Sequence, residues 1–160
     1  MAVDMFLKLD PIKGESQDGT HKEAIDVLAW SWGLSNSGSA QIGEGAGSGK
    51  ANFQDISITK WIDKSSAELL YACASGKHIA KAQLIVRKAG EKPLEYLLYD
   101  FENVLVSAVS TGGSGGEDRL TENVTINFAK VKCEYWTQNK DGSKGKSANF
   151  SWDIPAGKKF

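Results

Sequence analysis

The chain has 160 residues and carries 19 Lys and Arg against 20 Asp and Glu, which gives a formal net charge of −1. This length suits about one domain with a single hydrophobic core, and the balanced charge excludes an overall attraction to nucleic acid or to anionic membranes. No segment has the roughly 18 consecutive apolar residues of a membrane-spanning helix, and the N-terminal segment lacks the basic and apolar regions of a secretory signal. We therefore expect synthesis and folding in the cytoplasm.

Apolar residues alternate with polar ones along most of the chain, which is typical of strands with one buried face. In chain order, the alternation predicts strands near residues 6–9, 24–34, 53–61, 81–88, 94–110, 120–136 and 146–154. In the second of these, one face carries Leu28, Trp30, Trp32 and Leu34, and the other carries Val27, Ala29 and Ser31. The tryptophan-bearing face is the expected core face.

The segment 120–136 is long for one strand, and the parity of its apolar residues changes partway along it. The first group is Val124, Ile126 and Phe128, and the second is Val131, Cys133 and Tyr135. A bulge or bend near Ala129 would absorb this change.

One segment has helical spacing. Ser65 and Glu68 have the S-x-x-E spacing of a capping box, and apolar residues follow at helical intervals as far as Gly76, which suits a helix C-terminus. The chain has 17 glycines but only 3 prolines, and many of the glycines lie in two loops, 35–50 and 111–118. The pattern predicts a mainly β fold, a barrel or sandwich with one helix at its side, as a single domain over residues 1–160.

The glycine-rich segment 45–50 is similar to a phosphate-binding loop but departs from its motif. Glu44 stands where the first glycine is needed, and Ala51 follows Lys50 where a Ser or Thr would hold magnesium. We therefore expect no nucleotide cofactor.

Ser114 is flanked by glycines that match the G-x-S-x-G motif of a hydrolase nucleophile elbow. In that hydrolase order a histidine follows the serine and a helix follows the loop, but His21 and His78 both precede Ser114 and strand alternation follows it. A flexible turn is the better interpretation, because a serine without a positioned base is a poor nucleophile. We predict no catalytic residue.

The remaining reactive side chains give no site. His21 and His78 have no companion Cys or clustered carboxylates, so we predict surface histidines and no metal centre. Cys73 and Cys133 are predicted to be small core residues rather than a disulfide. The five tryptophans allow a platform for sugars or bases, but alternation places several of them on buried faces.

Five ordered segments together resemble one protein family. They are residues 1–9, 23–33, 58–66, 72–78 and 110–128. From the N-terminus to about Tyr135 the chain resembles Hcp, the haemolysin-coregulated protein, which is the tube protein of bacterial type VI secretion.

The resemblance implies a small β-barrel of two antiparallel sheets with one flanking α-helix. It implies homohexameric rings that stack into a hollow tube, a surrounding contractile sheath, a VgrG-type spike at the tip, and small effector proteins carried in the lumen. It further implies a protein that is cytoplasmic before firing and is then secreted without a cleaved signal peptide. The expected role is that of a structural component and export chaperone, not an enzyme, with no cofactor.

Two sets of residues are candidate contacts in such an assembly. Glu117, Asp118 and Arg119 lie in one of the matching segments and in a polar loop, so we expect them to make contacts between rings or neighbouring subunits. Val27, Ala29 and Ser31 lie on the non-core face of their strand and are the expected lumen lining. The alternatives are a lectin-like β-barrel that binds ligands through exposed tryptophans, and a serine hydrolase that uses Ser114.

Overall fold

The computed structural model describes residues 2–38 and 50–160. Within these ranges the elements are β1 (Val3–Lys8), β2 (Ile25–Ser31), β3 (Leu34–Asn36), β4 (Ala51–Phe53), β5 (Ile56–Trp61), α1 (Ser65–Ser75), β6 (His78–Lys88), β7 (Leu94–Thr111), β8 (Thr121–Gln138) and β9 (Lys144–Asp153). The predicted mainly β class is confirmed. Much of the glycine-rich loop 35–50, including the segment similar to a phosphate-binding loop, lies outside the described ranges.

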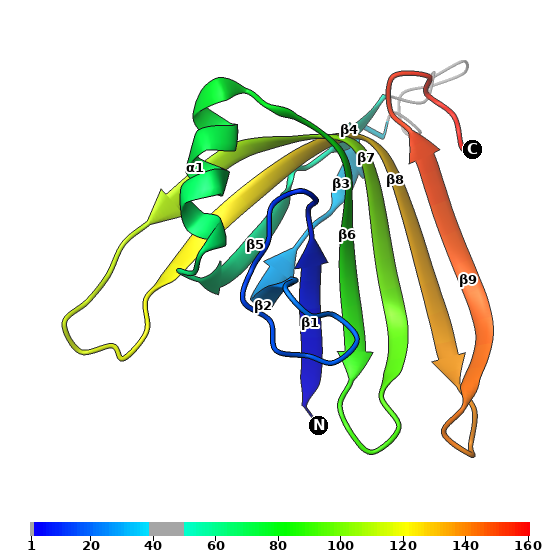
Figure 1. Cartoon of the computed structure of the whole chain (residues 1–160). Coiled ribbons are helices and arrows are strands. Elements are labelled where there is room, and N and C mark those ends of the chain that lie inside the picture. Colours follow the sequence, from blue (N-terminus) through cyan, green and yellow to red (C-terminus); the bar gives the residue numbers. More distant parts are fainter. Residues whose placement is uncertain (1, 39–49) are drawn as a thin grey trace.

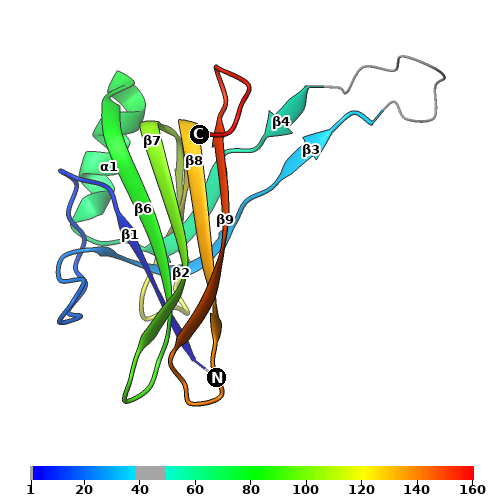
Figure 2. The same cartoon turned by 90° about the vertical axis from the view of Figure 1, so that its right-hand side faces the viewer.

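Six strands form a closed antiparallel barrel. The order of the large sheet is β5-β2-β1-β6-β7-β8-β9, and β5 also pairs with β8, which closes the ring. Strand β9 pairs with β8 from outside this ring, and β3 pairs with β4 in a separate two-stranded ribbon that projects from the barrel (Figures 1 and 2). The small β-barrel with a flanking helix that the resemblance implies is therefore confirmed.

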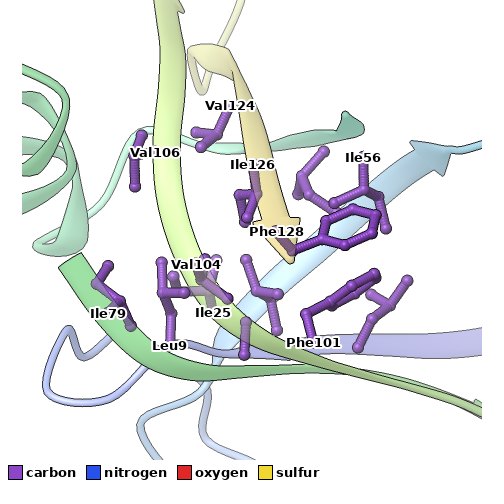
Figure 3. Close-up of a cluster of buried hydrophobic side chains, with 14 of the residues drawn as sticks. Leu9, Ile25, Ile56, Ile79, Phe101, Val104, Val106, Val124, Ile126 and Phe128 are labelled. Atoms are coloured by element: carbon purple, nitrogen blue, oxygen red, sulfur yellow. The ribbon is translucent and has the colours of Figure 1, made fainter. Parts of the chain in front are cut away.

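The core fills the interior of the barrel (Figure 3). Each of the six ring strands contributes fully or nearly fully buried side chains, among them Leu7, Ile25, Ile58, Leu84, Phe101 and Ile126. Removing such a side chain from water stabilises the fold by roughly 1.5–3 kcal/mol. Because the alternation along each strand directs these residues inward, burial fixes the register of the ring.

The helix begins with a different cap from the one that the sequence predicted. Ser65 is the first residue of α1, and the carboxylate of Asp63 accepts hydrogen bonds from the backbone N–H (2.8 Å) and the hydroxyl of Ser65. In return, the hydroxyl of Ser66 accepts a hydrogen bond from the backbone N–H of Asp63 at 3.0 Å. The cap at the start of α1 is therefore formed by hydrogen bonds of Asp63 with Ser65 and Ser66 rather than by the predicted pair Ser65 and Glu68, and the N-cap residue Lys64 makes no side-chain capping bond. The predicted helix end is confirmed, since Gly76 adopts a left-handed conformation with φ 65°.

The parity change predicted in the long strand is present without a register shift. Buried residues in β8 alternate as far as Phe128 and then resume at Val131. Pairing with β7 keeps one register across this point, with Val104 opposite Phe128 and Glu102 opposite Lys130. The irregularity lies on the partner strand, where Asn103 has φ 55°. The sheet therefore bends near Ala129 by a local change in the neighbouring strand.

The C-terminal strand is more exposed than the alternation suggested. Trp152 packs partly against the core, but Ala148 and Phe150 on the same face of β9 are exposed. The reason is topological, because β9 lies beyond the closed ring and only part of its inner face meets the barrel.

The loop between β1 and β2 is held against the sheet by Arg87 of β6. The guanidinium of Arg87 donates hydrogen bonds to both carboxylate oxygens of Asp18 and to Asp4, and it lies 5.1 Å from the centre of the Phe6 ring. The hydrogen bond from Arg87 is the main cause of the lowered pKa of the Asp18 carboxyl, and backbone hydrogen bonds from His21 and Thr20 contribute. This arrangement ties residues distant in the sequence into one charged cluster.

Candidate functional site

The loop between β7 and β8 presents the three charged residues that the sequence singled out. Glu117, Asp118 and Arg119 are all exposed. Together with Trp61 and Thr121 they line a shallow hollow of about 440 Å³. The guanidinium of Arg119 lies 4.4 Å from the centre of the Trp61 ring, a cation–π contact. The loop therefore offers a polar surface anchored on the barrel by one aromatic contact.

A buried ionic cluster lies at the same end of the barrel. Lys60 of β5 and Glu122 of β8 are cross-strand partners, their side chains form an ion pair, and both side chains are 0% exposed. The Lys60 ammonium also lies 3.1 Å from the carboxylate of Asp63 and donates a hydrogen bond to the carbonyl of Trp61 at 2.8 Å. The hydroxyl of Ser66 donates to Glu122 at 2.6 Å.

This cluster joins three elements at the point where the barrel closes. Lys60 and Glu122 belong to the closing strand pair, and Asp63 and Ser66 form the helix cap. Removing one partner of such a pair leaves an uncompensated buried charge, which is strongly destabilising. The cluster therefore positions α1 and the start of β8, from which the Glu117–Arg119 loop extends.

The sequence alone did not predict this cluster, although the positions of its charged residues carry a signal for it. Lys60 has the same parity as the buried Ile56 and Ile58, and Glu122 has the same parity as the buried Val124 and Ile126. Opposite charges at core positions of two strands indicate a buried pair once the strands are known to be neighbours.

The exposed face of β2 contains two of the three residues expected in the lumen. Ala29 and Ser31 are exposed, but Val27 is buried in the core. The register of β2 against β5 shifts between Val27 and Ala29, so the two residues do not share a face. Placing Val27 on the exposed face was therefore wrong, because strict alternation takes no account of a bulge. For the same reason Leu28 is exposed rather than in the core.

Ser114 does not lie in the structural setting of a catalytic serine. Ser114 is exposed in the loop after β7, and the next element along the chain is strand β8 rather than the helix that a nucleophile elbow requires. His78 is exposed, as expected, but His21 is buried, and its Nε2 lies 2.5 Å from a carboxylate oxygen of Glu95. The prediction of a surface position for His21 was wrong, because the loop between β1 and β2 folds onto the sheet.

The thiols and metal-binding side chains form no reactive centre in the described residues. Cys73 and Cys133 are both free and half-buried. Burial raises the pKa of the Cys133 thiol, which disfavours the thiolate, and burial together with Cys133 raises the pKa of Tyr99 to about 12. Over residues 2–38 and 50–160, no group of three or more His, Cys, Asp or Glu side chains is arranged to hold a metal ion.

The tryptophans are engaged within the fold. Trp30, Trp32 and Trp152 pack against the core, and Trp30 and Trp32 both contact Tyr99 edge-on. Trp136 lies 3.8 Å from the ammonium of Lys144, and Trp61 lies under Arg119. The majority are packing residues, as the alternation predicted.

Comparison with known proteins agrees with this architecture. The family model described as type VI secretion system effector, Hcp, matches residues 6–135. Protein hcp1 of Pseudomonas aeruginosa is 60% identical over 156 residues, which cover 96% of each chain.

Solved structures resemble the whole subunit. One described as a type six secretion system protein has a TM-score of 0.93 at 31% identity and covers 99% of this chain and 100% of its own. Hcp1 from Salmonella typhimurium has a TM-score of 0.81 at 38% identity and covers 100% of both chains. In the part of the chain that the structure describes, no helix is long and apolar enough to cross a membrane.

Proposed function

The chain belongs to the Hcp family of type VI secretion proteins, and on that premise we propose that it is a structural subunit of the secretion tube. Six copies form a ring, and rings stack into a hollow tube that a contracting sheath expels from the cell. The observation that carries the proposal is the likeness over nearly the whole chain to a family member at 60% identity.

The fold gives physical support for assembly. Within residues 2–38 and 50–160, strand β9 pairs with another strand on one side only, and its other edge has an isolated bridge from Asp153 to Lys158. The β3–β4 ribbon projects away from the barrel (Figure 2). Unpaired strand edges favour association with other chains, and a head-to-tail interface that closes by rotation produces a ring. Association therefore covers edges that the closed barrel leaves open.

Stacking between rings is assigned to the loop at 117–119. Its side chains are charged and exposed, and Arg119 is held on Trp61. Polar contacts of this kind give orientation and modest affinity rather than permanent association. Such contacts would hold rings together during ejection and limit premature polymerisation in the cytoplasm.

The lumen is assigned to the exposed face of β2. Ala29 and Ser31 are small and leave room for a folded guest, and Val27 is not part of this wall. The proposed guests are small effector proteins, and the other partners are the contractile sheath and a VgrG-type spike. The protein resides in the cytoplasm before firing and is exported with the tube.

The test is the number of copies in the purified particle. Native mass spectrometry is expected to give a hexamer, and negative-stain microscopy is expected to show hollow rings. A monomer at micromolar concentration, with tryptophan fluorescence that responds to sugars, would instead support the lectin-like barrel. The engagement of Trp30, Trp32 and Trp152 in packing disfavours that alternative.

A further inference from the structure

The buried cluster at the closure of the barrel holds an amine against a carboxyl group. Lys60 and Glu122 are cross-strand partners, and the Nζ atom of Lys60 contacts Oε1 of Glu122. Both side chains are 0% exposed. Because the fold already holds the two groups together, the entropic cost of bringing two reactants into contact has been met. The pair therefore contains the two reactants of an amide bond in contact with each other.

Asp63 is placed to carry a proton in such a reaction. Its carboxylate lies 3.1 Å from the Lys60 ammonium, and its side chain is 6% exposed. An amine attacks through its free electron pair, so the ammonium must first lose a proton. A carboxylate within hydrogen-bond distance of the nitrogen is the kind of group that general base catalysis requires. Asp63 therefore adds the proton acceptor that the amine and the carboxyl group need.

The two oxygens of the Glu122 carboxylate have different surroundings. Oε1 accepts the hydrogen bond from the Ser66 hydroxyl at 2.6 Å and contacts Lys60. Oε2 is buried, and no group among the described residues is its hydrogen-bond partner. A buried polar atom without a partner is costly, and conversion of Glu122 into an amide removes one of its two oxygens. Oε2 is therefore the oxygen that this site can lose.

Burial of the pair favours the amide over the two ions. Water stabilises a separate ammonium and carboxylate, and both ions lose that hydration when they enter the core. An amide carries no charge, so its formation removes the cost of holding two ions away from water. Neither side chain has exposed area, so solvent does not reach the bond to hydrolyse it. The site thus differs from surface ion pairs, which stay hydrated.

We propose that Lys60 and Glu122 condense into an intramolecular amide, which joins β5 to β8 covalently where the barrel closes. Asp63 takes one proton from the Lys60 ammonium, and the electron pair freed on Nζ forms a bond to Cδ of Glu122. The bond between Cδ and Oε2 breaks. The departing oxygen takes a second proton from the nitrogen and the proton held by Asp63, and it leaves as water. The amide keeps one hydrogen, Asp63 returns to its carboxylate form, and the reaction needs no oxidant or cofactor.

The amide changes what holds the barrel closed. The freshly folded chain has the ion pair, and the amide forms from it afterwards. The joined residues are 62 positions apart in the chain, so the bond closes a long loop and restricts the unfolded state. A linked barrel cannot open between β5 and β8 unless a covalent bond breaks. This property goes beyond the tube role proposed above and does not depend on it.

Mass spectrometry of the denatured wild-type chain tests the amide. A linked chain is lighter by one water than its sequence requires, and trypsin cannot cleave after Lys60 once the amine is acylated. We therefore expect a fragment in which residues 51–64 are joined to residues 120–130, and tandem fragmentation locates the bond. The linked fraction is followed with time after refolding. Lys132 and Glu134, which form a solvent-accessible ion pair at 2.9 Å, are the internal control and are expected to stay unlinked.

Conservative variants separate the chemistry from the packing. Glu122→Gln has the same shape, but its condensation with Lys60 releases ammonia, so the linked variant is expected to have the same mass as the linked wild type. Asp63→Asn keeps a side-chain oxygen beside Ser65 but removes the proton acceptor, and we expect it to slow linkage roughly a hundredfold. Circular dichroism verifies that each variant is folded. Lys60→Met combined with Glu122→Leu has neither reactive group and is the unlinked reference, and its urea midpoint is expected to lie below that of the linked wild type.

Each outcome supports or overturns a part of the proposal. A folded wild type that keeps its full mass after prolonged incubation and gives separate fragments 51–60 and 120–130 overturns the amide, and it leaves the buried ion pair and the tube function standing. Equal rates of linkage in the wild type and in Asp63→Asn overturn the role of Asp63 as the proton carrier. A linked wild type in which Lys132 is unlinked, together with an equal final mass for Glu122→Gln, supports the proposal.

Discussion

Lys60 and Glu122 form a fully buried ion pair between the two strands that close the barrel, and the same carboxylate accepts a hydrogen bond from Ser66 in the helix cap. The pair thus connects barrel closure to helix placement. Removing one partner of a buried ion pair leaves the other charge uncompensated and is strongly destabilising, whereas replacing both partners with apolar residues of similar volume is often neutral.

Truncating one partner is predicted to be costly. Glu122→Ala leaves the Lys60 ammonium buried without its strongest partner, and we expect the free energy of unfolding to fall by about 3–5 kcal/mol. Urea denaturation followed by circular dichroism measures the change. Replacing both partners, as Lys60→Met with Glu122→Leu, is the control and is expected to recover most of the loss. Equal stability of Glu122→Ala and the wild type would contradict the buried pair.

Gly14 is predicted to tolerate no side chain. A Cβ atom at this position would lie 2.6 Å from the carbonyl oxygen of Ala24 and 2.7 Å from the Cα of Ile25, and both are backbone atoms. We expect Gly14→Ala to lower the free energy of unfolding by about 1–3 kcal/mol. Gly19 lies in the same loop and has no atom within 4 Å of such a Cβ, so Gly19→Ala is expected to change it by less than about 0.5 kcal/mol. Thermal unfolding of the two variants makes the comparison.

The contact between Arg87 and Asp18 predicts a pH dependence. The folded-state pKa of the Asp18 carboxyl is lowered from its ordinary value of 3.8, chiefly by the hydrogen bond from Arg87. The unfolded chain therefore binds more protons than the folded chain between the two pKa values. The stabilisation is complete above the ordinary pKa and is lost as the pH falls below it.

Denaturant titrations between pH 3 and pH 6 measure this dependence. Asp18→Asn retains the side-chain oxygen that accepts hydrogen bonds from Thr20 and His21 but removes the charge. We expect the variant to be less stable at pH 6 and to lose less stability on acidification. A wild-type slope that Asp18→Asn leaves unchanged would assign the acid sensitivity to other carboxylates.

Removing the charges of the β7–β8 loop is predicted to affect stacking but not ring formation. Asp118→Ala with Arg119→Ala is expected to shorten or abolish tubes in electron micrographs of packed rings, because exposed loop charges set the orientation of weak contacts. Lys132→Ala with Glu134→Ala removes a 2.9 Å ion pair from the barrel wall and is the control. Tubes of unchanged order in the loop variant would remove Asp118 and Arg119 from the stacking contact.

A bulky residue at position 31 is predicted to interfere with guests. Ser31→Trp adds a large side chain to the exposed face of β2, and we expect effector binding and secretion to decrease while the ring remains intact. Ala80→Trp, at an exposed small residue of β6, is the matched control and is expected to leave both unchanged. If every effector tested is secreted normally with Ser31→Trp, this face is not the lumen wall.

Alternation predicted the β class and the general positions of the strands because one face of each ring strand meets a common core. Alternation gave wrong positions where a bulge interrupts a strand or where a charged residue occupies a core position. The register shift between β2 and β5 places Val27 in the core, and the burial of the charged Lys60 at a core position of β5 depends on Glu122 in the strand beside it. Both depend on the neighbouring strand, which local periodicity does not identify.

The site was predictable only in part for a similar reason. The loop at 117–119 was identified from its composition, but the cation–π contact of Arg119 with Trp61 joins residues far apart in the chain. The sequence motif pointed to Ser65 and Glu68, whereas the hydrogen bonds at the start of α1 join Asp63 to Ser65 and Ser66. Burial of Ser66 against Glu122 selects between the two.

Because the ring of six strands closes without β9, the barrel does not need the last strand to complete its hydrogen-bonded circuit. The backbone hydrogen bonds between β9 and β8 therefore break when one edge strand separates from the sheet. Those between β7 and β8 break only when the ring itself is disrupted. In an isolated subunit β9 is accordingly the unit with the lowest opening free energy among the large strands. Assembly that covers this strand would raise that free energy, so proton exchange in β9 would report subunit association more sensitively than exchange in the barrel.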